Sequence, residues 1–288
     1  MGAGSERPGR IEGWSRAPLA GRLPAILLVA AVGLGAVVRE LAPYVLIVVL
    51  FGYLASRRFG NRSTALAAVL PAAAILAWRA LPQALADPTG ADCANLLAPP
   101  AVWRFLEGAV GLIAILALLR DRTSSPAELG LRRSSRRMLL LAVVAVLIVA
   151  PLAIYAATLL GGGRFGDTFF GTYSLDLSQP LALLPALVFA ASNALAEELS
   201  YRGAMRVWLT PSLGVVGANL AQAIVFGLSH TGADFVGLQG LLPTLVAMVV
   251  VGYVAGVVAR RTRSLLLPIA IHLAFDIPIY LYWACQVG

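Results

Sequence analysis

Nine apolar runs, separated by polar or arginine-bearing loops, limit what this chain can fold into. They cover residues 23–38, 41–55, 64–78, 102–119, 138–160, 181–207, 213–230, 238–259 and 265–284. Within a bilayer only helices and closed barrels satisfy every backbone polar group, and runs of this length suit helices. Charged residues make up only 12% of the 288 residues, too few to cover the surface of a water-soluble domain. We therefore predict an all-α, polytopic transmembrane helix bundle with about eight or nine spans.

The basic residues give the expected orientation of these spans. All 22 are arginines, and the arginine-rich loops lie at residues 1–22, 57–62, 120–137, 202–206 and 260–263. Cytoplasmic loops of membrane proteins are enriched in basic residues, so placing these segments inside gives nine alternating spans with an internal N-terminus. If the first two runs instead form one re-entrant hairpin, the span count drops and an external C-terminus no longer follows. The positions of the arginines fit cytoplasmic loops beside the lipid bilayer, so the net charge of +8 does not indicate nucleic-acid binding.

Loop composition predicts four parts in the chain. These are a cytoplasmic tail (1–22), accessory N-terminal transmembrane helices (23–119), a basic cytoplasmic linker (120–137) and a functional core of four to five helices (138–288). The chain contains no lysine and much alanine, which indicates a high-GC coding bias and suggests a multi-pass protein of a bacterial inner membrane. The two cysteines, Cys93 and Cys285, could form one external disulfide, but we expect two free thiols.

Two adjacent carboxylates, Glu197 and Glu198, follow the apolar run from Leu181 to Leu195. At the centre of a membrane helix each acidic residue costs about 2.5–3.5 kcal/mol on insertion scales, so this pair needs compensation. Glu198 and Arg202 stand four residues apart, in the order that favours an ion pair on one helix face. Glu197 lies on an adjacent face. We therefore predict that Glu197 carries the chemistry and that Glu198 holds Arg202.

The only two histidines, His230 and His272, also lie in apolar helices, and Asp276 shares the helix face of His272. At 1.5 Å rise per residue, the expected heights above the inner helix ends are about 18 Å for Glu197, 27 Å for His230, 12 Å for His272 and 18 Å for Asp276. These heights cluster around the middle of a membrane. Because buried polar groups at that depth face a bundle interior or a water-filled cavity, we expect one shared site.

Three motifs on successive helices carry a family resemblance: Glu-Glu-x-x-x-Arg, Phe-x-x-x-His and His-x-x-x-Asp. In this order they resemble the CPBP family of intramembrane glutamic endopeptidases, which includes the Rce1-like CAAX prenyl endopeptidases and bacteriocin-processing relatives. The resemblance covers about residues 138–286 and identifies that region as a protease core. It implies roles for six residues: Glu197 as the water-activating base, His230 as its partner, His272 and Asp276 as oxyanion stabilisers, and Glu198 and Arg202 as supports.

Asp276 departs from the CAAX proteases, which have Asn at this position. An ionised aspartate beside a developing oxyanion would repel it, and two roles avoid this. Asp276 either stays protonated and donates a hydrogen bond, or stays ionised and turns towards His272, which then donates as a cation. We favour the protonated donor, because Asn supplies a donor at the same place in the family that this chain resembles.

The predicted function is therefore hydrolysis of a peptide bond, by glutamate-activated water and without a cofactor, in a peptide or in the C-terminal or leader segment of a membrane-associated protein. A zinc protease with His230, His272 and a carboxylate as ligands is one alternative, although the chain has no H-E-x-x-H motif. Buried acids and histidines also occur in transporters, but we find no inverted repeat. A proteolytically inactive immunity protein is a third alternative.

Other polar or small residues in the apolar runs predict packing rather than catalysis. We expect Asn193 and Gln222 to make interhelical hydrogen bonds and Glu107 to face the bundle or an interface. Gly252 and Gly256 are four residues apart, which is typical of a close helix contact.

Overall fold

The computed structural model describes residues 18–60, 63–81, 93–122, 124–132, 135–160, 180–231 and 238–284, and all structural statements concern these residues. Within them the regular elements are helices and no strand occurs, so the predicted all-α class is confirmed. Helical segments long and apolar enough to cross a membrane are Leu19–Val37, Arg39–Arg58, Pro99–Arg122, Leu183–Leu228 and Leu242–Thr262, with shorter apolar helices at Thr64–Arg79 and Leu266–Leu281. These segments make the chain a multi-pass membrane protein.

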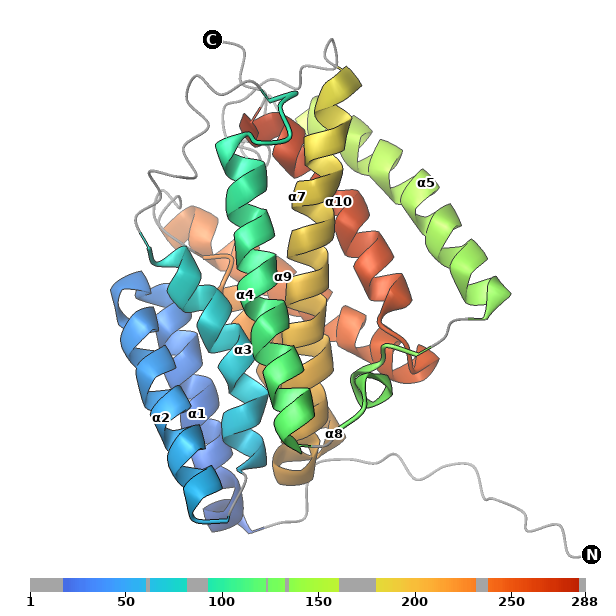
Figure 1. Ribbon diagram of the computed structural model, residues 1–288. Coiled ribbons are helices and arrows are strands. Elements are labelled where there is room, and N and C mark those ends of the chain that lie inside the picture. The colour runs from blue at the N-terminus through green and yellow to red at the C-terminus, as the bar shows by residue number, and fades with distance from the viewer. Residues whose placement is uncertain are drawn as a thin grey trace, which may run out of the picture.

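The first two apolar runs form two helices joined by a short turn. Helix α1 (Leu19–Val37) leads through the short η1 turn (Arg39–Leu41) into α2 (Ala42–Arg58). Next in the chain come α3 (Thr64–Arg79) and α4 (Pro99–Arg122). In space α2, α3, α4 and α7 (Leu183–Glu197) stand side by side in that order (Figure 1). This row brings N-terminal helices next to the helix that carries the first predicted catalytic residue.

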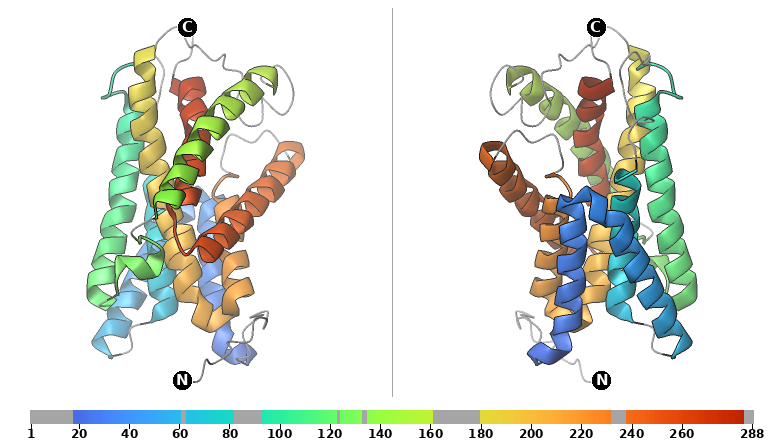
Figure 2. Two further views of the ribbon diagram at one scale, coloured as in Figure 1. Left: turned by 90° about the vertical axis from the view of Figure 1, so that its right-hand side faces the viewer. Right: turned by 90° about the vertical axis from the view of Figure 1, so that its left-hand side faces the viewer.

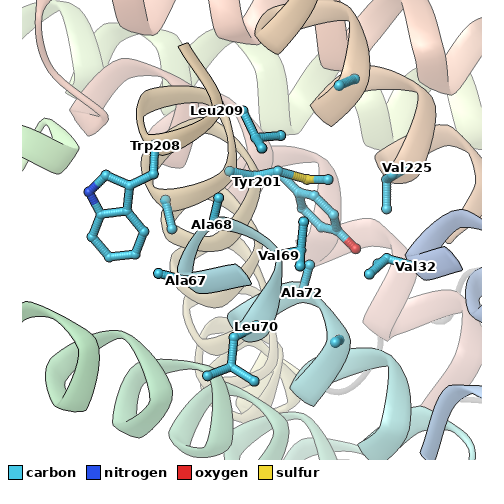
Figure 3. Packing of buried hydrophobic residues seen from close by; sticks show 14 of the residues in the cluster. Val32, Ala67, Ala68, Val69, Leu70, Ala72, Tyr201, Trp208, Leu209 and Val225 are labelled. Atoms are coloured by element: carbon cyan, nitrogen blue, oxygen red, sulfur yellow. The ribbon is translucent and has the colours of Figure 1, made fainter. Parts of the chain in front are cut away.

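Helix α3 lies inside the bundle rather than against lipid. Every residue from Ala67 to Ala77 is buried. Most of them are alanines, and small side chains let neighbouring helices approach closely. Figure 3 shows Val69 and Ala72 of α3 beside the ring of Tyr201. The C-terminal end of α3 is thereby held in the interior.

Helix α7 continues without interruption into a π-helix, η5 (Glu198–Met205), and then into α8 (Arg206–Leu228). At about 1.5 Å per residue the 46 residues from Leu183 to Leu228 are far too long for one crossing of a 30 Å core. The chain turns at Gly214, whose φ of 75° and ψ of 170° are open to glycine but not to other residues. Helix α8 then packs back against η5. The two predicted runs 181–207 and 213–230 are therefore two arms of one bent helical segment.

The remaining helices flank this bent segment. Helix α10 (Leu266–Ala284) packs against both α5 (Arg136–Leu160) and α7, while α9 (Leu238–Thr262) packs against α8. Figure 2 shows α5 and α9 inclined away from the axis of α7. The Tyr280 hydroxyl of α10 donates to the carbonyl oxygen of Cys93 at 3.0 Å. Cys93 itself is disulfide-bonded, so the expectation of two free thiols is wrong; Cys285 lies outside the described residues.

The loop before α5 is anchored beneath the π-helix. A short 3₁₀ turn, η3 (Pro126–Leu129), ends at Gly130, which has a positive φ of 90°. The Leu129 side chain is fully buried, and the backbone N–H of Leu265 donates to the carbonyl oxygen of Gly130 at 3.1 Å. A Cβ on Gly203 of η5 would touch Leu129 at 3.5 Å. The predicted linker therefore packs directly onto the segment that carries the acidic pair.

Candidate active site

Glu197 and Glu198 lie where α7 passes into η5, and both side chains are buried. A π-helix inserted into an α-helix shifts the angular order of its side chains and is common at functional sites. Here Glu198 pairs with Arg202, whose Nη1 lies 3.2 Å from Glu198 Oε1. Glu197 points the other way, towards α3. The predicted division between a paired Glu198 and a separately directed Glu197 is confirmed.

Glu198 holds more than its arginine. His272 Nδ1 lies 2.9 Å from Glu198 Oε1, a distance at which a protonated Nδ1 donates to the carboxylate. The Arg202 guanidinium also lies over the ring of Phe226, 3.9 Å from its centroid, which is a close cation–π contact. One buried carboxylate thus joins η5 to α10, and it fixes the His272 ring with Nε2 turned towards Glu197.

His230 lies just beyond the end of α8 at Leu228, not inside the helix as predicted. It belongs to a turn in which its backbone N–H donates to the carbonyl oxygen of Gly227 at 3.1 Å. Its Nδ1 lies 2.7 Å from the carbonyl oxygen of Phe226, and because a carbonyl only accepts, Nδ1 carries the proton. In the neutral ring Nε2 is then an acceptor, and it faces Glu197.

The predicted site residues meet at Glu197 Oε2. This oxygen lies 3.6 Å from His272 Nε2 and 4.0 Å from His230 Nε2. It is buried and accepts no hydrogen bond from any described residue. The expectation of one shared site is confirmed.

Asp276 lies at the edge of this group. Its Oδ2 is 3.6 Å from His272 Nε2, longer than a hydrogen bond, and it accepts from Asn193 Nδ2 at 2.9 Å. The predicted interhelical hydrogen bond of Asn193 is therefore confirmed, and it joins α7 to α10. An acceptor at Oδ2 suits both alternatives for Asp276, since a proton could sit on Oδ1.

Arg79 is the functional-site residue that sequence reasoning missed. Its Nη2 donates to Glu197 Oε1 and also to Glu107 Oε1, at 2.6 Å for the latter, and its Nε donates to the same Glu107 oxygen at 3.0 Å. Arg104 Nη1 donates to the other Glu107 oxygen at 2.6 Å. Arg79 is the last residue of α3, where a basic residue is usual, so its position gave no signal. The signal was Glu107, a further acid in an apolar run, which needed a cation once buried.

The formal charges of the buried acids and arginines around Glu197 sum to zero only if the cluster holds one additional proton. Its buried carboxylates are those of Glu107, Glu197, Glu198 and Asp276, and its guanidinium groups are those of Arg79, Arg104 and Arg202. Four negative and three positive charges leave one negative charge uncompensated. A proton on Asp276 or a second proton on His272 removes it. These are the two alternatives that the sequence left open for position 276.

The packing predictions around α8 and α9 also hold. Gln222 Nε2 donates across the interface to the carbonyl oxygen of Gly252 at 2.9 Å. A Cβ on Gly256 would lie 1.8 Å from Asn219 Oδ1, so this contact is closed to any larger residue. Among the described residues, no group of three histidine, cysteine or acidic side chains is arranged to hold a metal ion.

Comparison with known proteins places this cluster in a family. Residues 179–278 match the family described as type II CAAX prenyl endopeptidase, Rce1-like. No curated protein and no solved structure gives a significant match to the chain. The matched segment includes all six predicted site residues but neither Arg79 nor Glu107. Residues 179–278 of this chain therefore form a domain of the Rce1-like CAAX prenyl endopeptidase (CPBP) family, which is a family of proteases.

Proposed function

We propose that this protein is an intramembrane endopeptidase that hydrolyses a peptide bond in a membrane-associated protein or peptide by means of water activated by Glu197. One observation carries the proposal. Glu197 Oε2 is buried, accepts no hydrogen bond from the described residues, and faces the Nε2 atoms of His230 and His272. A carboxylate oxygen in that position suits a general base that takes a proton from water in a site shielded from solvent.

In the proposed reaction Glu197 Oε2 takes one proton from water, and the resulting hydroxide attacks the carbonyl carbon of the scissile bond. His230 Nε2, as the acceptor of its neutral ring, orients the water. The carbonyl oxygen becomes an oxyanion beside His272 and Asp276. When the C–N bond breaks, the proton held by Glu197 passes to the leaving nitrogen. Glu197 thereby returns to its ionised state, and the products are a new carboxylic acid, which then ionises in water, and a new amine.

Oxyanion stabilisation calls for a donor already in place. Because His272 Nδ1 is directed at Glu198, only Nε2 of that ring is turned to the reaction centre. If His272 holds the extra proton of the cluster, Nε2 donates to the oxyanion. If Asp276 holds it, Asp276 donates instead. In both cases Glu198 and Arg202 support the reaction by holding the His272 ring.

We also propose a wider organisation that fits these observations. Residues 1–22 form a cytoplasmic tail, 23–119 accessory helices, 120–137 a basic cytoplasmic linker and 138–288 a protease core of four to five helices, with eight or nine spans in all. The expected location is a bacterial inner membrane. The substrate class is a peptide, or the C-terminal or leader segment of a membrane-associated protein, in keeping with the peptide substrates of the family.

A peptide library tests this proposal. Purified protein in lipid nanodiscs is incubated with synthetic peptides, each made with and without a farnesyl group on a cysteine near the C-terminus, and products are identified by mass spectrometry. We expect internal cleavage by the wild-type protein and none by Glu197→Gln, which keeps the shape of the side chain but removes the base. The proposal is wrong if the wild-type protein cleaves no peptide, or if Glu197→Gln cleaves every peptide that the wild-type protein cleaves.

A zinc protease is the second candidate, since it would use the same residues, although no group of three histidine, cysteine or acidic side chains in the described ranges is arranged to hold a metal ion. The Nε2 atoms of His272 and His230 lie 3.6 and 4.0 Å from Glu197 Oε2. Two histidines and a glutamate are a known ligand set of zinc proteases. Against this candidate, the His272 ring is directed by Glu198, and Glu197 is engaged by Arg79. Metal analysis of active protein separates the two candidates.

A further inference from the structure

We infer that Arg79, which lies outside the family-matched segment, is a positioning residue that selects which oxygen of Glu197 acts as the base. The inference rests on the proposed function, because it concerns the orientation of the proposed base. It means that residues 179–278 do not contain the whole catalytic apparatus. The N-terminal helix α3 supplies a part of it.

The place of Arg79 in the fold brings its guanidinium to the site. Arg79 ends α3, the helix that is buried along its length between α2 and α4. Its side chain is only 14% exposed. Since α3 also packs against η5 and α8, the end of the helix is fixed relative to Glu197 from more than one side. The backbone of Arg79 is therefore fixed relative to Glu197, which limits the positions that its long side chain can take.

The contacts of Arg79 make the two oxygens of Glu197 different. Oε1 accepts from Arg79 Nη2, while Oε2 accepts from no described residue and faces the histidines. The terminal torsion of a glutamate side chain is broad and roughly two-fold, so an untethered carboxylate can rotate. The charge-assisted bond at Oε1 opposes this rotation. The lone pairs of Oε2 therefore stay directed to the reaction centre before substrate arrives.

Arg79 is itself held in place by two neighbours. Its Nε and Nη2 both donate to Glu107 Oε1, at 3.0 and 2.6 Å, which fixes one edge of the guanidinium. Nη2 also reaches Asn193 Oδ1 at 3.3 Å, and the Nδ2 of the same amide donates to Asp276. Asn193 thereby links the group that orients the base to the group beside the oxyanion. A single network from α3, α4, α7 and α10 sets both halves of the proposed reaction.

A purely structural role for Arg79 makes a different prediction. If Arg79 only neutralises buried acids, its loss lowers stability, and the folded fraction of a variant keeps the wild-type turnover number. A positioning role lowers kcat in the folded protein and leaves KM nearly unchanged, because the lost interaction acts on the reacting atoms rather than on substrate binding. Arg57 offers a matched control. It is paired with Asp121 at 2.9 Å between α2 and α4, away from Glu197, and is 46% exposed.

The experiment measures kcat and KM for wild-type protein, Arg79→Gln, Arg79→Lys and the control Arg57→Gln, with the library peptide that the wild-type protein cleaves fastest. We expect Arg79→Gln to lose kcat about 100-fold, the scale of a small misplacement of a catalytic group. Arg79→Lys should recover only about tenfold of that 100-fold loss in kcat, because one ammonium group cannot reproduce the planar fork that joins Glu107 to Glu197. Arg57→Gln should retain wild-type kinetics.

Three results overturn the inference. One is a folded Arg79→Gln with the kcat of Arg57→Gln. If Arg79→Gln does not fold, wild-type kcat in Arg79→Lys overturns it, since the fork would then be dispensable. The third is additive thermal destabilisation by Arg79→Gln and Glu197→Ala in a double-mutant cycle, because groups in contact must couple. Failure of the proposed function looks different: the wild-type protein itself then shows no cleavage that depends on Glu197.

Discussion

Removal of Arg202 tests the electrostatic account of the site without any knowledge of the substrate. Arg202 is buried, with 1% of its surface exposed. Its Nη1 lies 3.2 Å from Glu198 Oε1, and its guanidinium lies 3.9 Å from the centroid of the Phe226 ring. Arg202→Ala removes both contacts and leaves Glu198 with only His272 as a buried partner. The variant should therefore be much less stable than the wild-type protein.

The expected size of the loss follows from the burial of the pair. Breaking a buried ion pair by deleting one partner costs about 3–5 kcal/mol. A desolvated cation–π contact contributes about 2 kcal/mol, part of which is already included in that figure because the two contacts share one group. We therefore expect Arg202→Ala to lower the free energy of unfolding by about 4 kcal/mol. Arg202→Lys should restore only part of it, since lysine lacks the planar fork.

The assay is unfolding in mixed micelles, followed by circular dichroism, with Arg57→Ala as the matched control. Arg57 also pairs with a carboxylate, but it is 46% exposed, and exposed pairs contribute about 0–1 kcal/mol. If Arg202→Ala and Arg57→Ala unfold within about 1 kcal/mol of each other, then Arg202 does not compensate a buried charge, and the reasoning fails.

Three further predictions concern metal, Asp276 and the α8–α9 contact. Active purified protein should contain no stoichiometric zinc, and phenanthroline should leave cleavage intact; one zinc per chain, lost and restored together with activity, would establish the zinc candidate instead. Asp276→Asn should retain cleavage and extend it to higher pH, because an amide donor cannot deprotonate. If the variant is instead less active and begins to lose activity at a lower pH than the wild-type protein, Asp276 is ionised and supports a charged His272. Gly256→Ala should lower the thermal stability by several degrees, because its Cβ would lie 1.8 Å from Asn219 Oδ1, and a Tm equal to that of the wild-type protein would contradict the close contact.

Local spacing predicted much of the site. Glu198 and Arg202 pair as a four-residue spacing indicates, and this left Glu197 to point elsewhere. The polar residues Asn193 and Gln222, placed in apolar runs, make the interhelical hydrogen bonds that burial demands of them. These inferences succeeded because a buried polar group in a membrane helix has few partners to choose from.

Arg79 was beyond the reach of such reasoning. It meets Glu197 from a helix 118 positions earlier in the chain, and no periodicity relates the ends of two helices that pack side by side. The π-helix was equally hidden, since its sequence from Glu198 to Met205 has no signature that separates it from an α-helix. His230 was predicted at the end of the helix 213–230 but lies two residues beyond it, because α8 ends at Leu228. Tertiary packing decided all three.

The cleavage rate of Glu197→Gln, measured on folded protein in nanodiscs, tests the central claim most directly. Glutamine has the shape of glutamate and can still contact Arg79, so binding and packing change little while the general base is lost. The account predicts that the wild-type protein cleaves and that cleavage by Glu197→Gln falls by at least about 100-fold, the smaller end of what a general base contributes. Cleavage by the folded variant at near the wild-type rate would show that Glu197 does not activate the water.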